Sequence, residues 1–266
     1  RRLALGREDP VRIRERLGYP GQARPEGTLV WVHGSSVGEM VSVLPLIERI
    51  LQQDKRLCVL VTSGTVTSAR IMADRLPARS QHQYIPIDQP SAIDRFLDHW
   101  RPDLALWVES ELWPNLINQT RSRDVPMAII NARMSEVSFR RWRCLPFLIR
   151  PLLQSFQFCI AQSASDAGRL GALGAHHVLF HGNLKSAAPP LSADPQDLYE
   201  LKTAIGRRPC WVAASTHTGE DEIIGAAHRQ LASQFPGLLT VLVPRHADRG
   251  DTVAKILGTL GLTVAR

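Results

Sequence analysis

Thr28-Leu-Val-Trp-Val-His-Gly-Ser-Ser-Val-Gly-Glu-Met40 is the segment around which the predicted fold of this chain is built. The apolar residues 29–32 predict a buried strand, residues 33–36 predict a turn, and a helical pattern begins near Gly38. α/β proteins often bind ligands where a strand leads through a turn into a helix, because the first amide groups of the helix have no partner within it.

Glu39 lies in the first turn of that predicted helix, where the positive end of the helix dipole favours an ionised carboxylate. We expect this side chain to be ionised and near solvent, a state in which it can accept a proton. Glu39 is therefore a candidate general base. The other interpretation is that a glutamate in a first helical turn serves only the helix.

Short apolar runs alternate with helical patterns along most of the chain, which predicts an α/β fold with a parallel sheet covered on both faces. One long helix, rich in arginine and aromatic residues, is expected from residue 138 to about residue 155. Strands are expected at residues 29–33, 57–61, 84–87, 104–108, 127–130, 158–161 and 177–180. Ligands of such sheets gather at the carboxyl ends of the strands. The residues that follow predicted strand ends, and so point towards one rim, are Glu39, Gly64, Glu109, Arg133 and Lys185.

A proline-rich stretch of small residues at 186–196 has the composition of a linker. After it a second series begins, with helices expected at 196–205 and 221–234 and strands at 210–214 and 238–243. The chain therefore predicts two α/β parts joined by a linker.

The composition limits the possible partners. The chain has 266 residues, a hydrophobic fraction of 44% and a net charge of +7. This positive charge suits a phosphorylated partner or an anionic membrane surface, and no nucleic-acid-binding signature accompanies it. No metal-ligand spacing occurs, so we expect chemistry that is independent of metal. The scattered cysteines predict buried, reduced thiols at Cys58, Cys144, Cys159 and Cys210.

Several short motifs carry competing interpretations. Residues 34–38 match the G-x-S-x-G elbow of α/β-hydrolases, with Ser36 as nucleophile, although in a hydrolase several strands should come first. Glu109 and Glu111 follow a strand end and are equally well explained by function or by helix capping. Lys185 and Arg245 each follow a strand end, where a cation can bind phosphate. The basic and aromatic residues 139–147 are suited either to anionic head groups or to a solvated surface.

An ordered set of motifs resembles the family of 3-deoxy-D-manno-octulosonic acid (Kdo) transferases of lipopolysaccharide synthesis, and it spans nearly the whole chain. The matching stretches are Trp31-Val-His-Gly-Ser-Ser-Val-Gly-Glu39, Tyr84-Ile-Pro-Ile-Asp88, Glu109-Ser-Glu-Leu-Trp-Pro-Asn115, Asn131-Ala-Arg-Met-Ser-Glu136, Gly182-Asn-Leu-Lys185, Ala214-Ser-Thr-His217 and Val243-Pro-Arg-His246.

The resemblance implies a GT-B fold, in which two Rossmann-like domains face each other across a cleft. It implies an N-terminal arm at 1–27, an acceptor-side domain at 28–185, a linker at 186–196 and a partial donor-binding domain at 197–266. The implied reaction is an inverting, metal-independent transfer of Kdo from CMP-Kdo to the lipid A precursor (lipid IVA), with no cofactor. The implied location is the cytoplasmic face of the bacterial inner membrane.

The resemblance also implies roles for individual residues. Glu39 takes the role of the base, and Glu109 and Lys185 stabilise the transition state. Residues expected to contact the CMP of the donor are Pro244, Arg245, Ser215 and Thr216. Residues expected to support the acceptor side are Ser36, Gly38 and Arg133.

This sequence departs from the family in two places. It has no counterpart of the amino-terminal membrane helix, and the later donor-binding motifs M-G-E and G-G-H-N-P-L-E are absent. We therefore expect an incomplete donor domain and little or no activity of this chain alone. Besides the hydrolase, the remaining alternative is a non-catalytic module that binds the acceptor.

Overall fold

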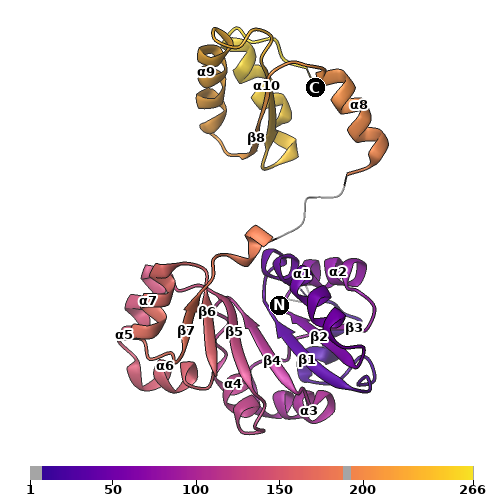
Figure 1. Cartoon of the computed structure of the whole chain (residues 1–266), viewed down its shortest axis with the longest axis vertical. Helices are drawn as coiled ribbons and strands as arrows, with labels where there is room; N and C mark the ends of the chain where they lie inside the picture. The colour runs from indigo at the N-terminus through magenta and orange to yellow at the C-terminus, as the bar shows by residue number, and fades with distance from the viewer. Residues whose placement is uncertain (1–7, 188–192, 266) are drawn as a thin grey trace. The chain divides into compact units, whose positions relative to one another are not determined.

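The computed structural model describes residues 8–187 and 193–265 of the chain. The chain divides into two compact units, Arg1–Pro189 and Pro190–Arg266 (Figure 1).

The first unit is built on a parallel sheet of seven strands in the order β3-β2-β1-β4-β5-β6-β7. Its strands are β1 (Thr28–His33), β2 (Leu57–Ser63), β3 (Ser80–Tyr84), β4 (Leu104–Val108), β5 (Met127–Ala132), β6 (Phe158–Ala161) and β7 (Val178–Phe180). Its helices are α1 (Val37–Gln53), α2 (Val66–Arg75), α3 (Pro90–Trp100), α4 (Pro114–Arg121), α5 (Glu136–Arg143), α6 (Pro146–Leu153) and α7 (Ala164–Ala172), with 3-10 turns η1 (Ile13–Leu17) and η2 (Leu184–Ala187).

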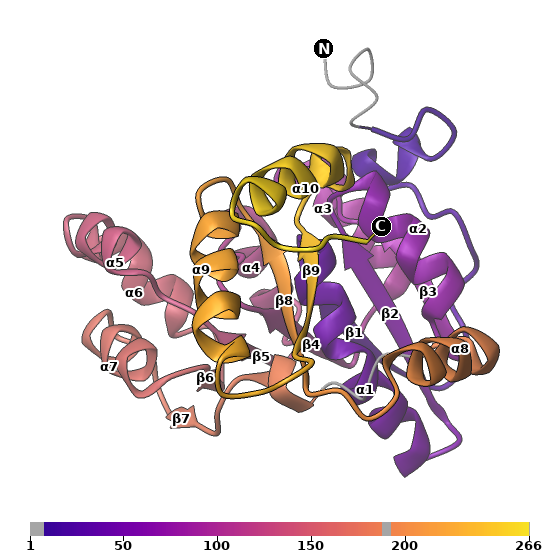
Figure 2. The same ribbon diagram turned by 90° about the horizontal axis from the view of Figure 1, so that it is seen from above.

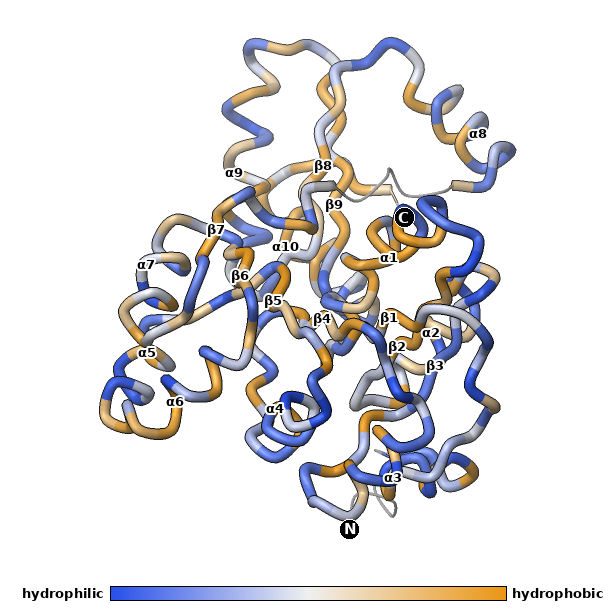
Figure 3. Tube along the Cα trace, turned by 60° about the horizontal axis from the view of Figure 1, so that its bottom comes forward, coloured by the Kyte–Doolittle hydropathy of each residue, from blue (hydrophilic) through white to orange (hydrophobic). Residues whose placement is uncertain are grey.

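Both faces of this sheet are buried, as the continuous apolar strands predict. On one face Val30 and Val32 of β1 pack with Met40 of α1 and Met72 of α2. On the other face Trp31 packs in a cluster with residues of α3, α4, α6 and α7. Figures 1 and 2 show α2 beside β3 at one edge of the sheet, and α5, α6 and α7 at the other. In Figure 3 the hydrophobic stretches coincide with strands such as β1 and β4.

The strand order places a topological switch point between β1 and β4. The chain builds outward from β1 to β2 and β3, then returns to place β4 on the other side of β1. The connections from β1 and β4 therefore leave the sheet in different directions, and ligands of open α/β sheets bind at such a switch point, beyond the carboxyl ends of the strands. The residues that follow β1 and β4 are those the sequence analysis selected, Glu39 and Glu109.

The strand predicted at 84–87 is wrongly placed along the sequence, because β3 is Ser80–Tyr84. This strand is polar, and two of its buried side chains, His82 and Gln83, have hydrogen-bond partners on other elements. The indole nitrogen of Trp100 donates to Oε1 of Gln83, and Oγ of Ser63 lies 2.9 Å from Nε2 of His82. Satisfied polar side chains can occupy buried strand positions, and a search for apolar runs misses them.

The single long helix expected at 138–155 is also wrong, because the segment forms two helices, α5, which ends at Arg143, and α6, which begins at Pro146. Proline disfavours helical geometry in the residue before it and suits the first turn of a new helix. The prediction of buried thiols is only half right. All four cysteines are free, with Cys58 and Cys159 buried but Cys144 and Cys210 exposed.

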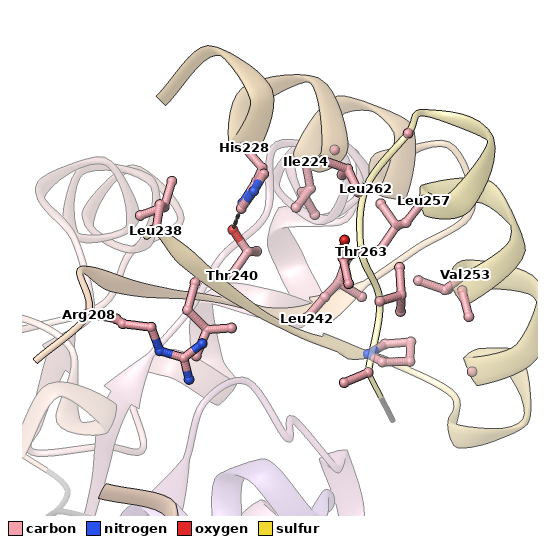
Figure 4. Close-up of a pocket in the computed structure, with 18 of the residues that line it drawn as sticks. Arg208, Ile224, His228, Leu238, Thr240, Leu242, Val253, Leu257, Leu262 and Thr263 are labelled. Atoms are coloured by element: carbon pink, nitrogen blue, oxygen red, sulfur yellow. Dashed lines mark hydrogen bonds between the residues drawn. The ribbon is translucent and has the colours of Figure 1, made fainter. Parts of the chain in front are cut away.

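The second unit contains a two-stranded parallel sheet. Its elements are α8 (Pro195–Ile205), β8 (Cys210–Thr216), α9 (Glu220–Ala232), β9 (Leu239–Pro244), η3 (Ala247–Arg249) and α10 (Gly250–Thr259). A cavity of about 910 Å³ is lined by residues of α9, β9 and α10 and by the stretch after α10 (Figure 4). Its labelled walls are mostly leucine, isoleucine and valine, with a hydrogen bond between Nδ1 of His228 and Oγ1 of Thr240 at one side.

Candidate active site

Glu39 is held by the turn between β1 and α1. Ser36 is the N-cap of α1, and its Oγ accepts a hydrogen bond from the Glu39 amide at 3.2 Å. The Glu39 side chain folds back over the turn, where its Oε2 accepts a 2.8 Å hydrogen bond from the Ser35 amide. Gly34 makes room for this, because a Cβ there would lie 3.3 Å from the same Oε2 and 2.8 Å from Sδ of Met40.

The expected exposure of Glu39 is wrong, because only 7% of the residue is accessible to solvent. Burial raises the pKa of Glu39 above its usual value, the hydrogen bonds from Ser36 and Ser35 oppose that rise, and the nearby charges of Glu109 and Glu111 add to it. The effect of the helix start, which favours the ionised form, is thus outweighed by desolvation. A raised pKa brings a carboxylate closer to the working pH that suits a general base.

Glu109 follows β4 directly and has a left-handed backbone with φ of 61°. Its amide remains tied to the sheet through a 3.0 Å hydrogen bond to the carbonyl of Ile130. Its Oε1 lies 2.9 Å from Nζ of Lys185, with the Glu109 side chain largely buried and the Lys185 side chain about half exposed. Non-glycine residues held in this conformation often occur at functional sites. The structure brings two of the proposed catalytic residues, Glu109 and Lys185, into direct contact. The third, Glu39, is close enough for the charge of Glu109 to raise its pKa.

Lys185 reaches the rim through residues that the sequence analysis did not select. The Leu184 amide donates to Oδ1 of Asn131, the last residue but one of β5, which has a φ of 52°, and the Lys185 amide donates to Oδ1 of Asn183. Asn183 in turn donates to Gln162. Asn131 and Asn183 both lie within the motifs that resemble the transferase family. Their amide side chains in those motifs were the sequence signal that could have identified them.

Glu111 was noted as the second acid of its motif but was given no role. Its Oε1 accepts a 2.8 Å hydrogen bond from Oγ of Ser35, and its Oε2 accepts one of the same length from the indole of Trp113. The loop after β4 is thereby joined to the turn that holds Glu39.

The proposed acceptor-side residues lie at exposed positions near this rim. Ser36 and Gly38 are exposed at the start of α1, and a Cβ on Gly38 would meet nothing within 4 Å. The Arg133 side chain is exposed, and its carbonyl accepts a hydrogen bond from Oγ of Ser110. The loops after β4 and β5 are therefore connected through Arg133.

His33 ends β1 beneath the turn and was not selected as a site residue. Burial lowers its pKa to about 4, more than the charge of Glu111 and the hydrogen bond to Thr62 raise it, and Arg16 lowers it further. The ring is therefore neutral at pH 7. Its Nδ1 lies 3.0 Å from Oγ1 of Thr62, and its buried Nε2 has no hydrogen-bond partner among the described residues.

In the second unit, the proposed donor residues occupy the ends of β8 and β9. Ser215 is exposed with a φ of 61°, and the Arg245 amide donates to the Thr216 carbonyl while the Arg245 side chain is exposed. Thr216 is buried and its hydroxyl donates to Oδ1 of Asp221, so this side chain serves the packing of the unit. Of these four residues, only Pro244 lines the apolar cavity.

Among the described residues, no group of three or more His, Cys, Asp or Glu is arranged to hold a metal ion. None of the helices in those residues is long and apolar enough to cross a membrane.

Comparisons with known proteins show the family to which the sequence is similar. A family model described as 3-deoxy-D-manno-octulosonic-acid transferase (kdotransferase) matches residues 11–188. A probable mitochondrial 3-deoxy-D-manno-octulosonic acid transferase from Arabidopsis thaliana is 36% identical over 99% of this chain and 61% of its own length. The corresponding transferase from Haemophilus influenzae is 34% identical over 92% of this chain and 58% of its own length. The chain thus spans about three fifths of the length of these relatives.

Solved structures support the fold. UDP-GlcNAc 2-epimerase from Neisseria meningitidis, bound to UDP-GlcNAc, has a TM-score of 0.63 at 15% identity, covering 87% of this chain and 70% of the epimerase. A glycosyltransferase from Rickettsia africae has a TM-score of 0.55 at 11% identity, covering 90% of this chain and 66% of that one. The predicted GT-B-like, Rossmann-like class is confirmed. With its first unit matched by the family model and relatives more than 30% identical over most of its length, the chain belongs to the 3-deoxy-D-manno-octulosonic acid transferase family.

Proposed function

We propose that this chain carries the acceptor side and catalytic base of an inverting glycosyltransferase, which moves Kdo from CMP-Kdo to the lipid A precursor. The observation that carries the proposal is the buried Glu39 carboxylate beside the Glu109–Lys185 pair, at the switch point of the sheet. A sugar hydroxyl is a weak nucleophile and needs a base to take its proton as it attacks. Glu39 is suited to that step because burial raises its pKa.

Lys185 and Glu109 are proposed to stabilise the transition state. As the bond from Kdo to CMP breaks, negative charge grows on the phosphate, and a fixed cation such as Lys185 is stabilising there. Glu109 holds the ammonium group in place through the 2.9 Å contact. In the second unit, Arg245 is proposed to bind the CMP phosphate, with Pro244, Ser215 and the backbone of Thr216 beside it. The reaction is proposed to need no metal, which activity retained in EDTA would support.

A serine hydrolase is the less favoured alternative. Oγ of Ser36 accepts from the Glu39 amide as a helix cap. A Ser–His contact does occur elsewhere, between Ser63 and His82, but it is unsuited to catalysis. Nδ1 of His82 faces the guanidinium of Arg12, so Nε2 carries the proton and faces Ser63. Labelling of Ser36 by a fluorophosphonate probe would reverse this conclusion.

We also propose that the protein works on the anionic cytoplasmic surface of the bacterial inner membrane. The α5–α6 surface supports this with exposed apolar residues, among them Phe147 and Val137, beside arginines including Arg141. Apolar side chains next to arginines are typical of surfaces that lie at a membrane interface.

The direct test of the proposed function is Glu39→Gln in the full-length protein that carries this sequence, assayed with CMP-Kdo and lipid IVA. Transfer should be lost while the circular dichroism spectrum stays unchanged. The matched control is Glu48→Gln, an exposed glutamate of the same helix, which should keep full activity. If Glu39→Gln keeps its activity, Glu39 is not the base. If the wild-type protein binds the acceptor but shows neither CMP affinity nor transfer, the non-catalytic module is favoured.

A further inference from the structure

Ser35 connects two acidic residues that come from different strand ends. Its backbone amide donates to Oε2 of Glu39, and its hydroxyl donates to Oε1 of Glu111, each at 2.8 Å. Ser35 and Glu111 are separated by 76 positions in the chain, so this contact exists only because β1 and β4 are neighbours in the sheet (Figure 1).

Glu111 is fixed on its other side as well. The Trp113 indole donates to Oε2 of Glu111, and the Trp113 backbone amide donates to the Glu111 carbonyl at 3.2 Å. Both carboxylate oxygens thus have partners within the protein. Trp113 is followed by Pro114, which begins α4, so the position of Glu111 is coupled to a helix start. A carboxylate held in this way is suited to positioning its neighbours.

We infer that Glu111 is a positioning residue for the transfer, holding Ser35 so that its amide stays on the Glu39 carboxylate and keeping negative charge beside that carboxylate. This inference rests on the proposed role of Glu39 as the base. Glu111 has no role among the site residues assigned above, and it acts through Ser35 without contacting the reacting atoms.

The charges around Glu39 make Glu111 different from Glu109. Glu109 is paired with Lys185, which offsets its charge. Glu111 bonds only to neutral donors, Ser35 and Trp113, and has no ion pair among the described residues. His33 is neutral, with its pKa lowered to about 4, and Arg16 acts on that ring. Glu111 is therefore a negative charge without an ion pair among the described residues, and it adds to the rise that burial and the charge of Glu109 cause in the pKa of Glu39.

The experiment measures the titration of Glu39 directly. The side-chain carboxyl of Glu39 is followed by ¹³C NMR between pH 3 and 8 in this chain, and its signal is assigned by its loss in Glu39→Gln. In Glu111→Gln the pKa of Glu39 should fall, because a like charge is removed. Glu48→Gln is the matched control and should leave the Glu39 titration unchanged. A Glu39 titration that does not move in Glu111→Gln overturns the inference.

A second measurement separates position from charge. Ser35→Ala keeps the backbone amide and the charge of Glu111 but removes the hydroxyl link, so kcat of the full-length enzyme should fall about tenfold, the effect of one hydrogen bond to a charged group. The acidic limb of the pH–rate profile should move to lower pH in Glu111→Gln. If Glu111→Gln does not fold, Trp113→Phe, which removes one bond to Glu111, must lower kcat without moving the Glu39 titration, or the inference fails.

The outcomes keep this inference apart from the proposed function. Loss of transfer in Glu39→Gln with an unmoved profile in Glu111→Gln supports the base and overturns the role of Glu111. Transfer that persists in Glu39→Gln overturns the base itself, whatever Glu111→Gln does to the titration.

Discussion

Nζ of Lys185 lies 2.9 Å from Oε1 of Glu109, although the two residues are 76 positions apart in the chain. Lys185 belongs to η2, which follows the edge strand β7, whereas Glu109 follows the central strand β4. The segment after β7 must therefore return along the rim of the sheet, and the hydrogen bond from the Leu184 amide to Asn131 holds it there.

Lys185→Ala tests the importance of this contact. We expect the rate of transfer in the full-length enzyme to fall by about 10²–10³, the usual effect of removing one group that stabilises developing charge. The free energy of unfolding should change by less than about 1 kcal/mol, because the lysine of this ion pair is half exposed. Lys55→Ala, at an exposed lysine of the same unit, should alter neither quantity. Equal losses in both variants would remove Lys185 from the site.

Gly34→Ala should displace the Glu39 carboxylate without touching it chemically. The new Cβ would lie 2.8 Å from Sδ of Met40 and 3.3 Å from Oε2 of Glu39, so one of these side chains must move. We expect a loss of about 1–3 kcal/mol in unfolding free energy and a larger loss of transfer. Gly168→Ala, in α7 with open space around it, should not destabilise the chain. Full activity in Gly34→Ala would show that Glu39 needs no such space.

Two buried histidines should make the first unit labile to acid. Burial lowers the pKa of His82 to about 3 and that of His33 to about 4, from 6.5 in each case. Below pH 6.5 the unfolded chain binds protons that the folded chain does not, so stability is full above that pH and falls as the pH drops towards 4. Lowering the pH from 7.5 to 5 should cost about 2 kcal/mol for each histidine.

Urea unfolding followed by tryptophan fluorescence at pH 7.5 and pH 5 measures this difference. In His82→Gln the difference should shrink by about 2 kcal/mol, since one of the two groups no longer titrates. His176→Gln, at an exposed histidine, is the matched control. A difference that stays the same in His82→Gln would contradict the assignment to His82.

Binding to vesicles tests the α5–α6 surface. The chain should bind vesicles rich in anionic lipid more tightly than zwitterionic ones, and salt should weaken that binding. Arg141→Ser should weaken it about fivefold, the equivalent of about 1 kcal/mol per basic residue near an anionic surface. Phe147→Ser should weaken it too, because 75% of Phe147 is exposed and available to the interface. Val11→Ser replaces another exposed apolar residue, distant in sequence, and should have no effect. Equal binding to both kinds of vesicle would contradict the proposal.

Local patterns were sufficient for most of the fold. Apolar runs such as β1 and β4 are buried on both faces, so they stand out in the sequence, and the turns after them mark the rim. The approach fails where local pattern and tertiary context differ. In β3 the polar His82 and Gln83 are buried because Ser63 and Trp100 supply partners from other elements.

The sequence was enough to select Glu39, Glu109 and Lys185 as candidate site residues, because each follows a strand and each lies in a motif. The sequence could not predict that Glu39 is buried, that Glu109 contacts Lys185, or that Glu111 reaches Ser35. These facts depend on which strands are neighbours, and strand order arises from the packing of the whole sheet. The spacing of apolar and turn residues, which acts over a few positions, determined the class of fold and the candidate residues. The contacts of the site join residues that are 76 positions apart in the chain. These contacts, and the burial of Glu39, were therefore decided only when β1, β4 and the segment after β7 came together.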